Sequence, residues 1–351
     1  MKIKHFLSFI VIILLFNSCS ANYPHNLHTT TRTEYALGTI VTVKVMQADE
    51  TSANHALDKA FERLSEIERV ASAKMPESEL FYVNQNAFLS DITVSEELFS
   101  LLKSGLFYSE LTGGAFDITL GSLIELWNIG NSADIIMAIP EYTRDANSIP
   151  AADEIAEALE NSGFEELVLN EENRSVRFLK QGLKLDLGAI AKGYAANEMK
   201  RVLHENNIKS ALLDLGGDIA FFGNSDENQG NPWVIGLTDP LNPAEICAKL
   251  RVSETSVVTS GDYERYFTYE GKNYHHIFDR NTGYPAGSGI ISATVITENS
   301  MTADALSTAF FVMGAEKATE IAANIPEIGY ILIDEDMNFV HSEGLDIEII
   351  K

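Results

Sequence analysis

The chain has 351 residues, with 51 acidic against 25 basic side chains and a formal net charge of −26 at pH 7. Such an acidic chain excludes nucleic acid as a partner, because phosphate backbones are bound by clustered lysine and arginine. With only two cysteines, the chain cannot build a cysteine-based zinc site. Its length is sufficient for one large domain with a sizeable core.

The first residues have the pattern of a bacterial lipoprotein signal. Lys2 and Lys4 precede an uncharged apolar run over residues 6–16, and Cys19 follows a small residue. The apolar run is too short to span a bilayer as a helix. We predict a signal peptide over 1–18, cleavage before Cys19 and lipidation of its thiol, which leaves Cys247 without a disulfide partner. The alternative is an ordinary secretory signal with a chance cysteine.

The next segments indicate where the fold begins. Residues 19–33 are polar without apolar periodicity, which predicts a flexible tether before a domain over 34–351. The β-branched run 39–45 predicts a strand, and apolar residues recur at helical spacing over 53–67. A second helix is expected from Ser95 to just before Gly113. Residues 130–150 predict an irregular surface excursion.

The second half of the chain alternates helices with short strands. We expect helices over 153–161 and 189–204, a hairpin around 170–173, and a final apolar helix over 300–313. After ALLDLGGDIAFFG, further strands are expected in runs that include WVIGL, SVVTS and YFTYE, and over residues 289–297. Mixed, largely antiparallel strands with inserted helices predict an α+β fold rather than a doubly wound sheet.

One segment, LDLGAIAKGYAAN, is suited to bind an anion. A strand passes through Asp186 into a glycine turn and directly into a helix that carries Lys192. Free N–H groups at a helix start attract phosphate, and Lys192 would add a local positive charge. In the alternative, Asp186 caps the helix and Lys192 is solvated.

A second segment, MTADALSTAFFVMG, contains two hard oxygen donors on one helix face. Asp304 and Thr308 are four residues apart. A carboxylate and a hydroxyl suit Mg²⁺, which keeps positions for water and substrate phosphates. Alternatively, Asp304 caps the helix and Thr308 bonds to a backbone carbonyl.

A third segment, GKNYHHIFDRNTGYP, offers a general base. His275 and His276 are adjacent, so on a strand they point to opposite faces and at most one can face a given site. A surface histidine pair beside a turn is the competing interpretation. Glycine pairs stand near Asp117 and Asp218, as expected where the backbone closely approaches a ligand.

These segments, in this order, resemble the ApbE family, the FAD:protein FMN transferases. The resemblance runs through ALGTIVTV, SELFYVNQ, GGAFDITLGSLIELW, LDLGAIAKGYAAN, LDLGGDIA, VVTSGDYERYF, YHHIFD, NTGYP and TADALSTA. It implies an ApbE-like (T-fold-like) two-lobed single domain.

The resemblance also implies a set of site residues. The Mg²⁺ ligands would be Asp304, Thr308 and the carbonyl of Ala189, and the base would be His276. The implied FAD contacts are Leu37, Lys74, Ala115, Phe116, Asp117, Asp186, Lys192 and Ile277.

The implied reaction transfers FMN from FAD to a Ser or Thr hydroxyl of another protein, forms a phosphoester and releases AMP. The partners it implies are acceptor flavoprotein subunits of membrane redox complexes and other extracytoplasmic flavoproteins. With the predicted lipid anchor, this places the protein outside the cytoplasm, on the periplasmic side of the inner membrane.

Two positions depart from the family pattern. Lys74 stands where relatives often have an aromatic residue, with Met75 at the following arginine, and Arg280 replaces a proline. These changes bear on flavin affinity and on the balance between transferring FMN and hydrolysing FAD. The alternatives are therefore a Mg²⁺-dependent FAD pyrophosphatase and a non-catalytic FAD-binding lipoprotein.

Overall fold

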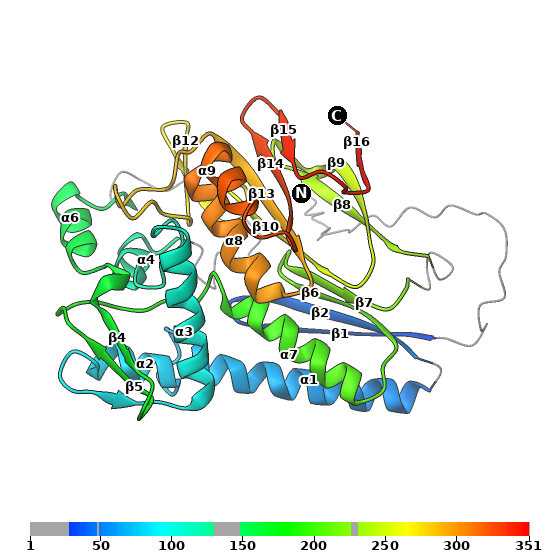
Figure 1. The fold of residues 1–351 in the computed structure, drawn as a ribbon, viewed down its shortest axis with the longest axis horizontal. Coiled ribbons are helices and arrows are strands. Elements are labelled where there is room, and N and C mark those ends of the chain that lie inside the picture. The colour runs from blue at the N-terminus through cyan, green and yellow to red at the C-terminus, as the bar shows by residue number, and fades with distance from the viewer. Residues whose placement is uncertain (1–27, 48, 130–147, 226–230, 351) are drawn as a thin grey trace, which may run out of the picture.

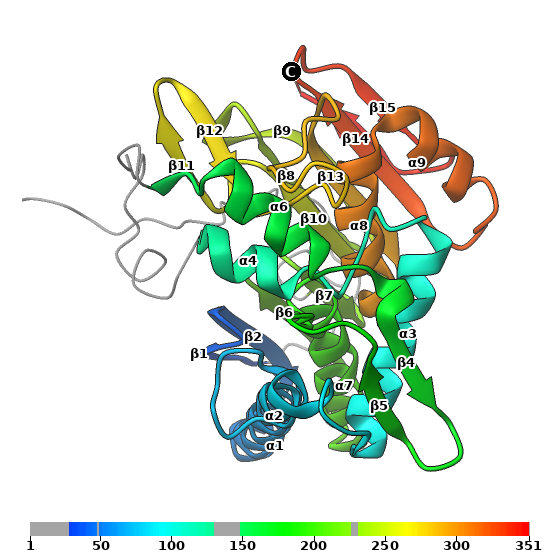
Figure 2. The same ribbon diagram turned by 90° about the vertical axis from the view of Figure 1, so that its left-hand side faces the viewer.

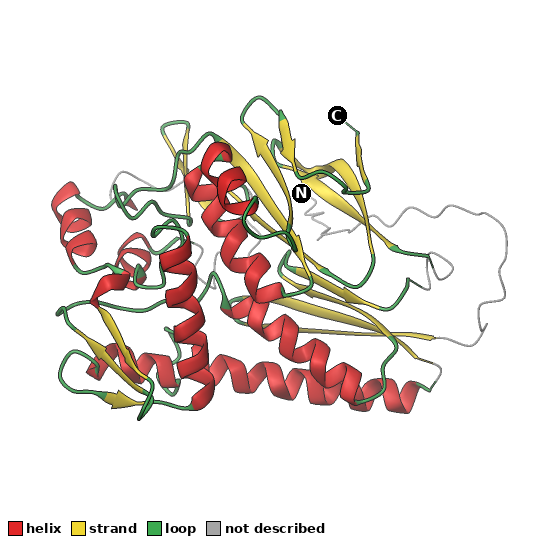
Figure 3. Ribbon diagram, in the orientation of Figure 1, coloured by secondary structure: helices red, strands yellow, loops and turns green. Residues whose placement is uncertain are grey.

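Three layers stack in the computed structural model, which describes residues 28–47, 49–129, 148–225 and 231–350 (Figures 1 and 3). A central eight-stranded sheet lies between a layer of helices and a smaller three-stranded sheet. The predicted signal peptide, Cys19 and most of the predicted surface excursion lie outside the described residues. Within the described ranges, no helix is long and apolar enough to cross a membrane.

The central sheet has the strand order β1-β2-β6-β7-β10-β13-β14-β15, and all of these neighbours pair antiparallel. Its strands are β1 (His28–Ala36), β2 (Thr39–Gln47), β6 (Ser210–Leu215), β7 (Ile219–Phe222), β10 (Ser256–Gly261), β13 (Ile290–Thr297), β14 (Gly329–Asp334) and β15 (Phe339–His341). Short turns join β1 to β2 and β6 to β7, whereas longer connections in the chain contain the helices and the strands of the smaller sheets.

Long helices cover one face of this sheet. They are α1 (Glu50–Ala71), α7 (Ala191–Glu205), α8 (Ser300–Met313) and α9 (Ala315–Ala322). Strand β2 shows how the two faces differ, because Val41, Val43 and Val45 point into the helical side while Met46 faces the other layer. The helices α1 and α7 lie side by side along the sheet, as Figure 1 shows.

A three-stranded sheet, ordered β16-β9-β8, packs on the opposite face. Its strands are β8 (Trp233–Asp239), β9 (Asn242–Val252) and β16 (Ile347–Ile349). Cys247 is fully buried in this interface, so it serves there as a small apolar side chain.

A smaller lobe lies beside the layered body (Figure 2). It contains α2 (Glu79–Asn86), α3 (Glu96–Leu111), α4 (Gly121–Trp127), α6 (Ala152–Glu160), the short 3₁₀ helix η2 (Phe164–Glu166) and the sheet β3 (Ile92–Thr93), β5 (Ser175–Phe178), β4 (Leu167–Asn170). A separate hairpin joins β11 (Tyr266–Tyr269) to β12 (Lys272–His275).

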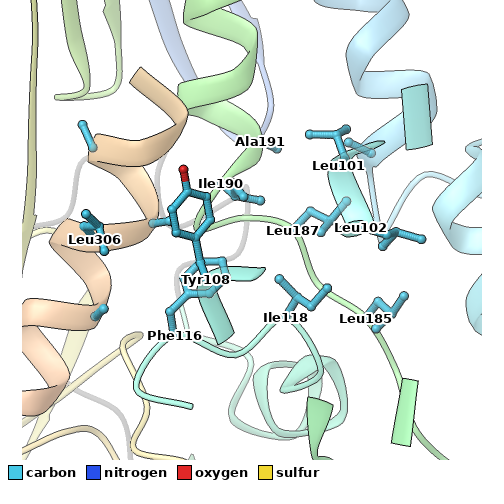
Figure 4. Packing of buried hydrophobic residues seen from close by; sticks show 14 of the residues in the cluster. Leu101, Leu102, Tyr108, Phe116, Ile118, Leu185, Leu187, Ile190, Ala191 and Leu306 are labelled. Carbon is cyan, nitrogen blue, oxygen red and sulfur yellow. The ribbon is translucent and has the colours of Figure 1, made fainter. Parts of the chain in front are cut away.

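The largest hydrophobic cluster joins the lobe to the body. Figure 4 shows how α3 and α8 pack against the two segments that contain Asp117 and Asp186. These two segments also share a hydrogen bond, from the Asp186 N–H to the Ile118 carbonyl at 2.9 Å. The labelled members of the cluster are Leu101, Leu102, Tyr108, Phe116, Ile118, Leu185, Leu187, Ile190, Ala191 and Leu306. The segments singled out in the sequence therefore rest on one common core.

The structure confirms the α+β class with largely antiparallel strands. The predicted end of the tether at residue 33 is wrong, because β1 begins at His28 and pairs with β2 along its whole length. Most of β1 is exposed at the edge of the sheet, so it lacks the apolar periodicity that marks a buried strand. The helices α2 and α4 were not predicted, and α9 follows the helix that was expected to be the last.

Candidate active site

The site forms where the N-terminus of α7 meets α8, two helices in contact along the layered body (Figure 1). Gly193 makes this contact possible, since a Cβ there would come within 2.3 Å of the Ser300 carbonyl oxygen. The close approach lets the Gly193 N–H donate to Asp304 Oδ2 at 2.9 Å. The Asp304 carboxylate thus lies at the positive end of the α7 dipole.

Lys192 lies between two buried carboxylates. Its Nζ is 2.9 Å from Asp218 Oδ2 and 3.3 Å from Asp304 Oδ1, and both carboxylate side chains are at most 4% exposed. Burial by itself would lower the Lys192 pKa, but the two carboxylates raise it above its usual value. Burial raises the pKa of Asp218 well above the ordinary range, with Asp304 adding repulsion. Lys192 is therefore an ion-paired cation rather than a solvated one.

The alternative readings of Asp186 and Asp304 as helix caps are not supported. Asp186 Oδ1 accepts from the Gly188 N–H at 2.7 Å, and α7 has no side-chain cap. The cap of α8 is Asn299, one turn before Asp304. The expected N–H groups at the start of α7 are not all open to a ligand, because Gly193 already donates to Asp304.

Two of the three oxygen donors implied for Mg²⁺ lie on α8, and the third lies in a turn that approaches the same ammonium as Asp304. Thr308 is one turn after Asp304 on α8, and its hydroxyl lies 3.3 Å from Ser260 Oγ rather than on a backbone carbonyl. The Gly188 carbonyl accepts from Lys192 Nζ at 3.4 Å, which brings the turn containing Ala189 to the same ammonium as Asp304. The arrangement already accepts a positive charge, and its donors are hard oxygens that fit Mg²⁺.

No group of three His, Cys, Asp or Glu side chains within the described ranges is arranged to hold a metal. A site built from Asp304, Thr308 and a backbone carbonyl is of a different kind, since it uses a single carboxylate. Mg²⁺ binds through few protein ligands and retains several waters, so such a sparse set remains compatible with it.

His275 has both ring nitrogens engaged by the protein. Its Nε2 donates to the Ala286 carbonyl at 3.0 Å, and its Nδ1 accepts from the Ile277 N–H at 3.3 Å. Because a carbonyl can only accept, this pattern fixes a neutral imidazole. Burial lowers the His275 pKa to about 4. His275 is a structural residue of the core.

His276 presents the opposite arrangement. Its Nδ1 lies 3.2 Å from the Arg265 carbonyl oxygen. Because a carbonyl can only accept a hydrogen bond, Nδ1 carries a proton and is the donor. No hydrogen bond to Nε2 occurs within the described part of the chain. Burial, with the charges of Arg265 and Lys192, holds the His276 pKa well below its usual value. The ring is therefore neutral at pH 7, with its proton on Nδ1 and with Nε2 unprotonated.

Glu264 adds a third acidic group to this neighbourhood, after Asp218 and Asp304. Its side chain keeps an exposed surface. Loss of hydration nonetheless raises its pKa to about 7, although the charges of Arg265 and Lys192 act in the opposite direction. The site therefore contains groups of very different proton affinity, which is common where chemistry is performed.

The other residues implied by the resemblance make contacts of their own. Leu37 is in the β1–β2 turn with φ +50°, and its N–H donates to Glu68 Oε1 at 2.8 Å. Phe116 is buried edge-on against Tyr108, so its ring belongs to the core. Ala115 and Ile277 pack in the same hydrophobic cluster as Phe116. Ile277 is buried there and Ala115 is partly buried.

Lys74 and Asp117 differ in their partners. Lys74 is exposed after the end of α1, and its ammonium has no hydrogen bond or ion pair within the described residues. The Asp117 carboxylate is buried and lies 3.4 Å from the guanidinium of Arg280. Lys74 is therefore available to a ligand, whereas Asp117 already has a protein partner.

Sequence reasoning missed three contributors. It did not identify Asp218 as the partner of Lys192, the Arg265 carbonyl as the group that orients His276, or Ser260 as the neighbour of Thr308. The Asp218 and Ser260 contacts join separate segments of the chain, whereas the Arg265 contact spans eleven residues. The polar motif TSGDYER, which begins within β10 and continues past its end, was the available signal for two of them.

Comparisons with known proteins agree with this geometry. Residues 37–332 match the model of the ApbE family. An FAD:protein FMN transferase of Treponema pallidum is 35% identical over 90% of this chain and 87% of its own length. One of Klebsiella pneumoniae is 31% identical over 87% and 89%, respectively.

Solved structures show the same fold. The ApbE protein of Thermotoga maritima superposes with a TM-score of 0.78 at 32% identity, over 90% of this chain and 97% of that one. The flavin transferase ApbE of Vibrio cholerae gives 0.76 at 26% identity over the same shares. Fold and site together define an enzyme of the flavin-transferase class. The chain belongs to the ApbE family, the FAD:protein FMN transferases.

Proposed function

We propose that this enzyme transfers FMN from FAD to a Ser or Thr hydroxyl of an acceptor protein, with Mg²⁺ and with release of AMP. The observation that carries the proposal is the fixed tautomer of His276, whose open Nε2 lies in the electrostatic neighbourhood of Lys192 and Arg265. A hydroxyl attacks phosphorus only weakly while it keeps its proton. A neutral base beside a cationic site is what this reaction requires.

In this proposal the protein supplies a base and an electrostatic frame. Nε2 of His276 accepts the proton of the attacking hydroxyl. Nδ1 retains its own proton, and its hydrogen bond to the Arg265 carbonyl stabilises the imidazolium. Lys192 is positioned to meet the phosphates of FAD, which would draw it from the carboxylates it now contacts. The reaction cleaves the P–O–P bond of FAD, forms the P–O bond to the acceptor, and lets AMP depart.

Asp304, Thr308 and the carbonyl of Ala189 would hold Mg²⁺. Bound there, the ion would neutralise charge on the pyrophosphate and help to hold it in line for attack. The support is the chemistry of the donors and the fact that Asp304 Oδ1 already faces a cation, the Lys192 ammonium. We propose FAD contacts at Leu37, Lys74, Asp186, Lys192 and Ile277 and along Ala115–Asp117. In this last segment the Phe116 ring is buried, and the N–H groups of Ala115 and Phe116 already donate to Thr112.

Lys74 favours one alternative reaction. A lysine cannot stack on a flavin or adenine ring as an aromatic residue would, and an exposed ammonium admits water to the site. If water replaces the protein hydroxyl, the same residues hydrolyse FAD to FMN and AMP. A non-catalytic FAD-binding protein is the third possibility, which the intact donor set of Asp304 and Thr308 disfavours.

We further propose that the enzyme acts outside the cytoplasm on a lipid anchor at Cys19. The support is the sequence pattern of residues 1–19. The acceptors would be flavoprotein subunits of membrane redox complexes on the periplasmic side of the inner membrane.

The test incubates the purified protein with FAD and Mg²⁺, with and without a candidate acceptor subunit, and follows FMN release by chromatography. The proposal expects slow FMN release alone and consumption of FAD with the acceptor, both lost when EDTA removes the metal. Rapid release that ignores the acceptor would favour the hydrolase. Tight FAD binding without turnover would favour the non-catalytic protein.

A further inference from the structure

The side chain of Arg280 makes contacts that the family resemblance does not imply. Arg280 follows β12 in the turn after Asp279, at the position where the family pattern that the sequence resembles usually has proline. Its guanidinium is 3.4 Å from Asp117 Oδ2 and 3.1 Å from Glu165 Oε2, and it lies over the ring of Phe164 with 4.9 Å to the centroid. One side chain therefore connects three segments that are distant in sequence.

The Asp117 carboxylate depends on this guanidinium. The side chain has no exposed surface, and its Oδ1 accepts from the N–H and the hydroxyl of Thr119 at 2.8 and 2.6 Å. Its Oδ2 is buried without any hydrogen bond. Burial raises the Asp117 pKa, while Arg280 favours the charged form. A buried carboxylate that loses its counter-charge is strongly penalised.

The loop that carries Asp117 is shaped to receive Arg280. Gly114 has φ +83°, and a Cβ on it would come within 2.3 Å of Arg280 Nη1 and 2.5 Å of Cδ. Only a residue without a side chain leaves room for the guanidinium at this place. The fit involves both partners, so it is a built contact rather than a chance surface ion pair.

We propose that Arg280 is a positioning residue for the flavin substrate, which ties the loop Gly114–Asp117 to the turn that follows Ile277. The inference rests on the proposed function, in which Ala115–Asp117 and Ile277 contact FAD from these two segments. Arg280 belongs to the turn after Ile277 and pairs with Asp117 of the loop, so it fixes the separation of these two segments. Its second ion pair, with Glu165, holds the guanidinium in place. In relatives with proline at this position, a different contact must set that separation.

Lysine cannot replace arginine in this role. The guanidinium contacts two carboxylates and a ring face at once through its planar shape, whereas an ammonium is a compact point charge. We therefore expect Arg280→Lys to recover only part of the function of Arg280, and Arg280→Ala to recover none. The matched control is Arg251→Ala, because Arg251 also pairs with two carboxylates, Asp346 and Glu348, but on the remote face of the molecule.

The experiment measures the FAD dissociation constant of the full protein from flavin fluorescence in the presence of EDTA, so that catalysis does not contribute. Arg280→Ala should raise it about tenfold, Arg280→Lys by less, and Arg251→Ala not at all. With Mg²⁺ and acceptor present, Arg280→Ala should raise KM for FAD and leave kcat within about threefold.

A double-mutant cycle separates positioning from general stability. In an Asp117→Asn background the further change Arg280→Ala should have a much smaller effect on FAD affinity, because the buried charge is gone. A fall in melting temperature with unchanged FAD affinity and unchanged KM in both Arg280 variants would overturn the proposal. Wild-type protein that does not bind FAD at all would instead overturn the proposed function.

Discussion

At the residue scale, the two adjacent histidines differ in what their ring nitrogens contact. His275 uses both nitrogens inside the core, and His276 keeps Nε2 open. The sequence restricted a given site to one of them, because adjacent strand residues point to opposite faces. The contact that distinguishes them is the Ile277 N–H, which occupies the second ring nitrogen of His275 and has no counterpart at His276 among the described residues.

Replacing His276 by alanine should abolish transfer and leave FAD binding intact. Loss of a general base lowers kcat by about 10²–10⁴-fold, whereas the proposed flavin contacts lie on other residues. Fixed-time assays of FMN transfer check the first expectation, and flavin fluorescence titrations check the second. His275→Gln is the control, since an amide can keep both hydrogen bonds. Unchanged transfer by His276→Ala would point to His275 or to a reaction without a histidine base.

The buried His275 also predicts how stability depends on pH. Its pKa is about 4 in the folded protein against about 6.5 when unfolded, so the unfolded chain binds more protons between these values. The stability from the neutral ring is fully present above pH 6.5 and is lost as the pH falls towards 4. The loss amounts to about 3 kcal/mol.

Urea unfolding at several pH values checks this linkage. The wild type should lose more stability between pH 6.5 and 4 than His275→Gln, which cannot titrate. The shared contribution of His276 cancels in this comparison. Equal slopes for the two proteins would show that His275 is not held neutral by the fold.

Replacing Asp304 by asparagine tests the proposed metal ligand. The amide keeps the shape of the side chain and can still accept from the Gly193 N–H, but it loses the charge that a metal requires. We expect at least about a 100-fold loss of activity and weaker Mg²⁺ binding by calorimetry, with cooperative unfolding preserved. Asp346→Asn, an exposed and remote carboxylate, is the control. Retained activity would discredit the assignment.

At the scale of elements, the site depends on how closely α7 approaches α8. Gly193 sets this distance, and the same glycine donates the hydrogen bond that holds Asp304. The sequence predicted both helices and the ligands on one face of α8, because these follow from local periodicity. It did not predict that the helix start would hold a carboxylate, because this contact joins residues more than a hundred positions apart.

Gly193→Ala should therefore disturb stability and metal binding together. The added methyl group has no space beside the Ser300 carbonyl, and overpacking of this kind costs about 1–3 kcal/mol. Moving α8 away would also displace Asp304 and weaken Mg²⁺ binding. Thermal unfolding and Mg²⁺ titration measure the two effects. Gly287→Ala is the control, since a Cβ there meets nothing within 4 Å. Equal behaviour of the two variants would contradict this view of the helix contact.

At the scale of the whole molecule, the sequence predicted the α+β class and most buried elements. The prediction from the sequence failed for exposed residues and for contacts between residues distant in the chain. The polar strand β1 was assigned to the tether because its exposed face hides the apolar alternation, although all nine residues pair with β2. The short helices α2 and α4 span only eight and seven residues, too few to show a clear period.

The predicted anchor is testable independently of the chemistry. Cys19→Ser should remove lipidation, so that the protein leaves the membrane fraction and no longer incorporates labelled palmitate. Catalysis by the purified domain should be unchanged, because the fold described here begins at His28. Membrane association that persists in Cys19→Ser would show that another feature holds the protein there.

The central claim is that a protein hydroxyl, rather than water, receives the FMN. The most direct measurement is the intact mass of a candidate acceptor subunit after incubation with the enzyme, FAD and Mg²⁺. We predict a mass increase of one FMN less one water, lost when the acceptor Ser or Thr is changed to alanine and absent with His276→Ala. Free FMN and AMP with an unmodified acceptor would contradict the account.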